Sequence, residues 1–366
     1  MRRIAGLAVV AASSLLVACT PDATDLGTDA VSVVATTTQI CDYVTELAAN
    51  QPDSDIRLEK TDSQGAVHSP QDGKPNLRLT CLLAPNASAH DHEMTPQQMK
   101  ALSSADLLLT NGVDLEHFLD DAIETSAFKG SLVVTSGVAN TNAGTGAFHT
   151  IAGPAKADVA PWPFAPEPGE EAEFSHDPHI WTSPAGATVQ VKNIGAALEK
   201  ADDKHAADWQ ARTAGYVDKL AALDRWARAS FETVPKQDRI LFTSHDAFGY
   251  LARDYGINFI GAALSDFNAQ QDATNSHIQQ AVEQVKESKT KVIFAENSNN
   301  SKSIEAVGRA TGVRVISNDD ALYGDSLGPE GTEGDTYIGS IVHNVQTLVT
   351  AWGGTVAPMP HELGHA

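Results

Sequence analysis

The chain has 366 residues, of which 42% are hydrophobic and 20% are charged, and its formal net charge is -22. This length exceeds what one hydrophobic core usually covers, so it predicts two lobes, and the composition argues against a largely disordered chain. The excess of acidic residues argues against nucleic acid as a partner, because nothing would neutralise the phosphates. Together these features fit a soluble extracellular domain.

The first 18 residues have the features of a signal peptide. Arg2 and Arg3 provide the positive start, and the apolar run 4–17 is too short to remain in a membrane as a spanning helix. The run ends in Leu-Val-Ala-Cys, which resembles the bacterial lipobox and implies cleavage before Cys19 and lipidation of its thiol. Residues 19–30 would then form a polar tether. The alternative is an ordinary signal peptide with an incidental cysteine.

Two further cysteines, Cys41 and Cys81, form an even pair in a chain bound for an oxidising compartment. We expect a disulfide between them. It would close a loop containing the polar stretch 50–76, which has the composition of an insertion. The alternative is two buried free thiols.

Strands and helices are predicted to alternate in the first half of the chain. Strands are expected at 30–38, 77–83, 106–110 and 131–135, and helices at 39–50, from Pro96 onward, and across Leu115, Phe118, Leu119 and Ile123. This alternation predicts a parallel sheet covered by helices, with ligand sites beyond the carboxyl ends of the strands. Residues 137–174 lack any period, and we expect them to form a long mobile loop.

The second half begins with two helical patterns, at 184–198 and 206–231, and the longer one suits a connection between lobes. Beyond it, strands are expected at 239–243, 257–262, 291–295 and 313–316, and helices at 247–255, 274–288, 301–311 and 337–352. The predicted division is 31–205 for the N-terminal lobe, 206–233 for the linking helix, 234–355 for the C-terminal lobe and 356–366 for a tail.

Four side chains in separate parts of the sequence are candidates for a metal site. His90 and His245 follow predicted strands, His179 follows an Asp-Pro turn, and Asp325 lies in a loop, so that each lobe supplies two. Three nitrogen ligands and one oxygen ligand suit tetrahedral zinc, whereas manganese prefers more oxygen and remains the alternative if Asp325 binds through both oxygens. A full set of four protein ligands leaves no place for a reactive water, which predicts capture rather than catalysis.

Several motifs resemble, in the right order, those of the zinc and manganese solute-binding lipoproteins of bacterial ABC importers. They are Ala89-His90 with Glu93, Thr95 and Pro96; Asn111-Gly112 with Leu115-Glu116; Asp177-Pro178-His179-Ile180-Trp181; Thr243-Ser244-His245-Asp246-Ala247-Phe248-Gly249-Tyr250; Tyr323-Gly324-Asp325-Ser326-Leu327; and Thr336-Tyr337 with Asn344. The first departs from the family pattern, because Ser88-Ala89 replaces Asp-Pro and His92 replaces an aromatic residue, so His92 is the alternative to His90 as the ligand there. Histidine rather than glutamate at 245 is typical of the zinc-type branch.

The resemblance implies two similar α/β lobes, each a parallel sheet covered by helices, joined by one long helix, with the metal in the cleft between them and limited hinge motion. It implies a lipid-anchored receptor on the extracytoplasmic face of the bacterial membrane that delivers Zn²⁺ to the permease of an ABC transporter. We expect a monomer, no enzymatic activity, and no membrane contact beyond the lipid. The alternatives are a manganese receptor of the same family and a metal-stabilised adhesin or scaffold lipoprotein.

Further residues are candidates for supporting roles. Three acids near the motifs, Glu116, Asp246 and Glu296, could orient the imidazoles or serve structural roles. Candidates for auxiliary metal binding are His92, His149, His176, His361 and His365.

The C-terminal segment from His361 to His365 fits the His-Glu-x-x-His pattern of zinc peptidases. That mechanism requires a helix and a third ligand downstream. Prolines at 358 and 360 and the end of the chain at residue 366 leave no room for them, so a chance tail, or one that loosely holds metal, is expected instead.

Overall fold

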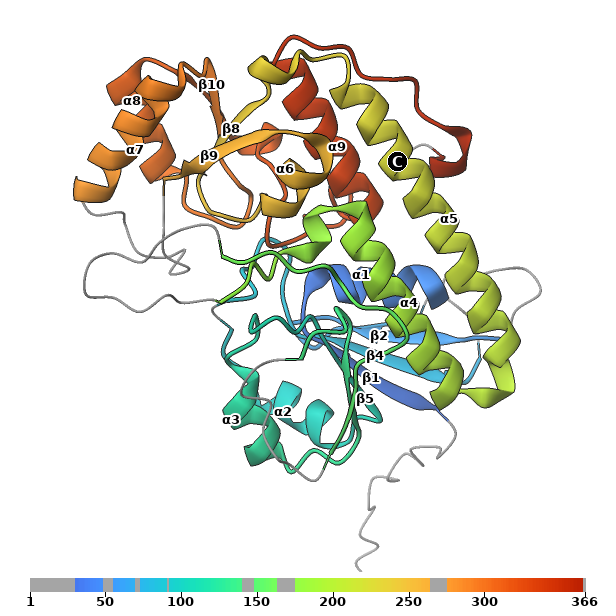
Figure 1. Ribbon diagram of the computed structural model, residues 1–366. Helices are drawn as coiled ribbons and strands as arrows, with labels where there is room; N and C mark the ends of the chain where they lie inside the picture. Colours follow the sequence, from blue (N-terminus) through green and yellow to red (C-terminus); the bar gives the residue numbers. More distant parts are fainter. Residues whose placement is uncertain are drawn as a thin grey trace, which may run out of the picture.

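The computed structural model describes residues 30–48, 55–69, 73–90, 92–139, 148–162, 175–263 and 275–364. Two α/β lobes lie one above the other, with the N-terminal lobe below in Figure 1. Helix α5 (Ala206–Phe231) runs along one side of both lobes, as the sequence predicts for a linking helix. The signal peptide, Cys19 and almost all of the tether lie outside the described residues.

The N-terminal lobe is built on a seven-stranded sheet of order β3-β2-β4-β1-β5-β6-β7. Its strands are β1 (Val31–Ala35), β2 (Leu58–Thr61), β3 (Val67–His68), β4 (Leu77–Cys81), β5 (Leu107–Thr110), β6 (Ser131–Val134) and β7 (His149–Ile151). Neighbours pair in parallel except β2 and β3. The helices of this lobe are α1 (Thr38–Ala48), α2 (Pro96–Ser103), α3 (Leu119–Ser126) and α4 (Pro184–Ala201). The predicted parallel sheet is confirmed.

Three strands of this sheet contradict the sequence prediction. Strands β2 and β3 lie in the stretch 50–76 that reads as an insertion, and β7 lies in the predicted loop 137–174. The β2 segment pairs with β4 over four residues and buries Leu58, so it is part of the sheet. These strands are short and carry polar residues, and their pairing is decided by distant partners, so local patterns fail to predict them. Residues 140–147 and 163–174 of the predicted loop lie outside the described residues.

Helix α3 also starts later than predicted, because Leu115 belongs to the turn before it. The buried carboxylate of Glu116 accepts hydrogen bonds from the backbone N–H groups of Asn111 and Gly112. Residues 113–114 have positive φ angles, which a right-handed helix excludes. The turn is therefore fixed by side-chain bonding to the backbone rather than by helical periodicity.

The C-terminal lobe has a four-stranded parallel sheet of order β11-β10-β8-β9. Its strands are β8 (Ile240–Thr243), β9 (Asn258–Ala262), β10 (Val292–Phe294) and β11 (Arg314–Ile316), and its helices are α6 (Gly249–Tyr255), α7 (Asn275–Ser288), α8 (Lys302–Thr311) and α9 (Tyr337–Ala351). Short 3-10 helices are η1 (Ile180–Thr182), η2 (Asp203–His205), η3 (Lys236–Asp238), η4 (Asn318–Asp320) and η5 (His361–Leu363). None of the described helices is long and apolar enough to cross a membrane.

One hydrophobic core continues from the N-terminal lobe into the C-terminal lobe. It includes Trp209 and Leu220 of α5, Tyr43 of α1 and Val345 of α9, all fully buried. The rings of Tyr43 and Tyr337 meet edge to face with centroids 5.1 Å apart. The lobes are thus joined by shared packing as well as by the linking helix.

Helix α1 is bonded to both lobes. Cys41 forms a disulfide with Cys81 at the end of β4. The carboxylate of Asp42 accepts a hydrogen bond from the backbone N–H of Tyr337 at the start of α9, at 2.9 Å. Gln39 donates its amide to the backbone oxygen of Asp325 at 3.1 Å. This single helix therefore holds the strand that leads to His90 and the loop that carries Asp325.

Replacing Cys41 and Cys81 together by serine is expected to lower the free energy of unfolding by about 2–4 kcal/mol. The disulfide closes a loop between residues 40 positions apart, and its loss gives that loop more freedom in the unfolded chain. Urea unfolding with and without reductant checks this. Reductant should destabilise the wild type and leave the double variant unchanged; equal midpoints for the two oxidised proteins would contradict the prediction.

Candidate metal site

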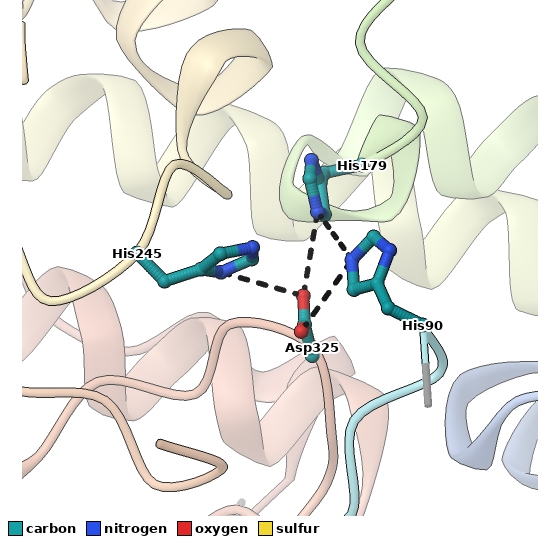
Figure 2. Close-up of side chains that lie close together, drawn as sticks. All are labelled: His90, His179, His245 and Asp325. Carbon is teal, nitrogen blue, oxygen red and sulfur yellow. Dashed lines mark hydrogen bonds and ion pairs between the residues drawn. The ribbon is translucent and has the colours of Figure 1, made fainter. Parts of the chain in front are cut away.

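Four side chains predicted from the sequence come together between the lobes. One ligand atom each of His90, His179, His245 and Asp325 lies within 4.8 Å of the others. Figure 2 shows the three imidazoles arranged around the carboxylate. The side chains are 3%, 0%, 4% and 1% exposed, in that order. The site is therefore closed to bulk water and lined by imidazole nitrogens and carboxylate oxygens.

Each of these residues lies on a loop at the end of a regular element. His90 follows β4 and His179 precedes η1, both in the N-terminal lobe. His245 lies two residues beyond the end of β8, and Asp325 lies between η4 and α9, both in the C-terminal lobe. Parallel strands bring their carboxyl ends to one edge of a sheet, which is where ligands bind in such folds.

The distances between the donor atoms fit one small cation. Nε2 of His90 and Nε2 of His179 are 3.1 Å apart. Oδ1 of Asp325 is 3.4 Å from Nε2 of His179 and 3.8 Å from Nδ1 of His245, and Oδ2 is 3.6 Å from Nε2 of His90. Ligands bound tetrahedrally to zinc lie about 3.3 Å from one another. The four side chains are thus close to the spacing that such an ion requires.

The imidazole of His179 is oriented by Asp177. Oδ1 of Asp177 accepts from the backbone N–H of His179 at 3.0 Å and lies 2.7 Å from its ring Nδ1. A proton held on Nδ1 leaves Nε2 directed toward the other ligands. The sequence motifs did not assign this role to Asp177, although an aspartate two residues ahead of a histidine has the spacing of an Asx turn.

Glu296, at the end of β10, contacts His245 in a similar way. Its Oε1 accepts from the backbone N–H of His245 at 2.8 Å, and its Oε2 lies 3.4 Å from Nδ1. Asp246 is buried beside these groups, and burial raises its pKa to about 8. Glu116 instead accepts from the hydroxyl of Thr36 and from the turn before α3, so it contacts none of the four.

Burial and charge act in opposite directions on the metal-free ligands. Burial lowers the pKa of His90 to about 4. Burial also disfavours the charged form of His245, but Asp325 and Glu296 outweigh it and raise the pKa to about 10. Burial alone would raise the pKa of Asp325, yet the neighbouring imidazoles of His245 and His90 hold it well below its usual range. The metal-free site thus combines an ionised carboxylate with a protonated imidazole.

Helix α6 is hydrogen-bonded to the loop that carries His179. The hydroxyl of Tyr250 donates to the backbone oxygen of Asp177 at 2.6 Å and accepts from the N–H of Ala160 at 3.0 Å. A Cβ on Gly249 would lie 2.3 Å from Oδ2 of Asp177, so only glycine allows this approach. The loop that carries His179 is therefore in contact, across the lobes, with the helix that follows His245, which the sequence did not predict.

Comparison with known proteins identifies a family whose members match this chain over both lobes. Residues 33–351 match the family described as "Zinc-uptake complex component A periplasmic". The chain belongs to this family. It is thus a metal-binding receptor of a metal-uptake system, and its match spans both lobes and all four clustered residues.

Relatives in the family differ in the metal that their names state. The chain is 31% identical to the iron-binding protein YfeA of Yersinia pestis, over 74% of this chain and 77% of that protein. It is 28% identical to the manganese-binding lipoprotein MntA of Bacillus subtilis, over 84% of this chain and 93% of that protein. It is 29% identical to the zinc-binding protein TroA of Treponema pallidum, over 80% of this chain and 84% of that protein.

A solved structure supports the two-lobe fold. That of the periplasmic zinc-binding protein TroA from Treponema pallidum aligns with a TM-score of 0.67 at 24% identity, and the alignment covers 88% of this chain and 99% of that one. The predicted fold class is confirmed.

The other histidines proposed from the sequence lie outside the cluster. His92 contacts Oε1 of Gln98 at 3.2 Å and packs on Phe118, so His90 rather than His92 faces Asp325. Three of these histidines are exposed: His149 on β7, His176 beside Ser175, and His361. The side chain of His361 is 94% exposed, and its Nδ1 lies 3.0 Å from Oε2 of Glu362. His365 lies outside the described residues.

Proposed function

We propose that this chain captures Zn²⁺ outside the cytoplasm and delivers it to the permease of an ABC transporter, without catalysing a reaction. The observation that carries the proposal is the buried cluster of His90, His179, His245 and Asp325. Membership in a zinc-uptake family supports delivery to a transporter. The metal is the cargo of the protein rather than a cofactor.

The donor set favours zinc among the metals that the relatives' names state. Three imidazole nitrogens and one carboxylate complete a tetrahedral shell, which zinc accepts readily. Manganese and iron prefer more oxygen ligands. Four protein ligands in a site this buried leave no position for a reactive water, which supports capture over hydrolysis.

The position of the protein at the membrane is a second part of the proposal. The lipobox-like sequence ending at Cys19 would anchor the mature chain by lipid on the extracytoplasmic face. Relatives named as lipoproteins, such as MntA, support this. We expect the receptor to be a monomer, since each chain supplies a full set of ligands.

Calorimetric titration of the metal-stripped chain that begins after Cys19 tests the proposal. It is run with Zn²⁺ and then Mn²⁺, beside a His179→Ala variant and a truncation before His361. We expect one tight zinc site that the truncation keeps and the variant loses.

Three other results would change the conclusion. Binding that survives His179→Ala but disappears with the truncation would move the site to the C-terminal segment and reopen the peptidase or tail-carrier alternatives. Tighter binding of Mn²⁺ than of Zn²⁺ would favour the manganese receptor. A metal whose removal unfolds the chain would favour the adhesin or scaffold alternative.

A further inference from the structure

The two oxygens of Asp325 have different surroundings. Oδ1 faces Nε2 of His179 and Nδ1 of His245, at 3.4 and 3.8 Å. Oδ2 accepts a hydrogen bond from the hydroxyl of Ser88 at 2.9 Å and lies 3.6 Å from Nε2 of His90. The hydrogen bond from Ser88 joins the His90 loop of one lobe to the Asp325 loop of the other.

Ser88 occupies the position that Asp177 has in the second histidine motif, two residues before the histidine. Both side chains accept from the backbone N–H of that histidine, at 3.3 Å for His90 and 3.0 Å for His179. The carboxylate of Asp177 also bonds its own imidazole. A hydroxyl carries a proton that an ionised carboxylate lacks, and Ser88 donates it to Asp325 instead.

This bond makes one carboxylate oxygen a poorer metal ligand than the other. A donated hydrogen bond lowers the charge that Oδ2 offers to a cation, and an ion that approached both oxygens would compete with Ser88. Oδ1 faces the imidazoles of His179 and His245 and has no hydrogen-bond donor among the described residues. Binding through Oδ1 alone gives three nitrogens and one oxygen, whereas binding through both oxygens gives the oxygen-richer shell that manganese prefers.

We propose that Ser88 is a specificity-determining residue: by holding Oδ2 of Asp325 it keeps the carboxylate bound to the ion through one oxygen and so favours zinc over manganese. This inference rests on the proposed function, in which the four clustered side chains bind the transported ion.

The test compares the mature wild-type chain with Ser88→Ala, Ser88→Thr and Ser326→Ala. Threonine keeps the hydroxyl. Ser326 is the matched control, because it is buried next to Asp325 but donates its hydroxyl to the backbone oxygen of Leu327 at 3.1 Å. Zinc and manganese affinities are measured by competition titration, and bound Co²⁺ is followed by visible absorption, which is stronger for four-coordinate than for five- or six-coordinate cobalt.

We expect Ser88→Ala to lower the ratio of zinc to manganese affinity about ten-fold, the effect of one hydrogen bond to a charged group. We expect its cobalt absorption to weaken as well. Ser88→Thr and Ser326→Ala should keep both the ratio and the spectrum of the wild type.

An unchanged ratio and spectrum in Ser88→Ala would overturn the inference while leaving the zinc receptor intact. Equal weakening of both metals in Ser88→Ala and Ser88→Thr would also overturn it, since that result describes a loop that needs serine only for its shape. Failure of the wild type to bind zinc tightly would instead overturn the proposed function itself.

Discussion

Replacing Asp325 by alanine is expected to weaken zinc binding by far more than 100-fold. Loss of a residue that merely orients a ligand lowers metal affinity by about 10–100-fold, and Asp325 is itself the negative charge at the centre of the cluster. Without it, three imidazoles would bind a divalent ion in a buried site with no compensating carboxylate among them. Zinc titration against a chromophoric chelator measures the effect.

Asp320→Ala is the control for this variant, because Asp320 lies in η4 of the same region but is exposed. It should bind zinc as the wild type does. Circular dichroism shows whether Asp325→Ala keeps its secondary structure. Affinity within ten-fold of the wild type in folded Asp325→Ala protein would mean that the ion binds elsewhere.

Lowering the pH from 7.5 to 5.5 is expected to reduce zinc affinity by at least about 100-fold. Near neutral pH the metal-free His245 carries a proton, because Asp325 and Glu296 overcome burial and raise its pKa to about 10. That proton must leave when the ring binds a cation, so affinity increases with pH and each released proton contributes about ten-fold per pH unit. His90, with its pKa lowered by burial to about 4, adds nothing in this range.

Calorimetry in two buffers of different ionisation enthalpy measures the protons released. We expect at least one per zinc ion at pH 7, and the same count in His361→Ala, whose exposed imidazole lies outside the cluster. An affinity that stays constant between pH 5.5 and 7.5, with no proton released, would exclude ligation by a protonated imidazole.

Sequence patterns predict those parts of the fold that are decided locally. The apolar stripe of α5 and the β-branched segment of β1 appear where they are expected, because each element buries a face set by its own periodicity. Strands β2 and β7 could not be predicted locally, because they depend on pairing with β4 and β6. Their own residues carry too little hydrophobic pattern to specify them.

The same limit applies to the site. The positions of His90, His179, His245 and Asp325 at loop ends can be predicted from motifs and from the rule that parallel strands end at one edge. The bonds of Ser88 to Asp325, and of Tyr250 to Asp177, join residues 237 and 73 positions apart. No local pattern encodes such pairs, since they depend on how the two lobes face each other.

The bonds of helix α1 restrict how an ion can leave. A wide swing of the lobes would separate Asp42 from Tyr337 and Gln39 from Asp325 while the disulfide kept α1 attached to β4. Those breaks would expose a core that both lobes share. Opening at one ligand loop would leave that core covered, so we expect the ion to leave through a loop movement. The permease would then release the ion by moving that loop rather than by separating the two lobes.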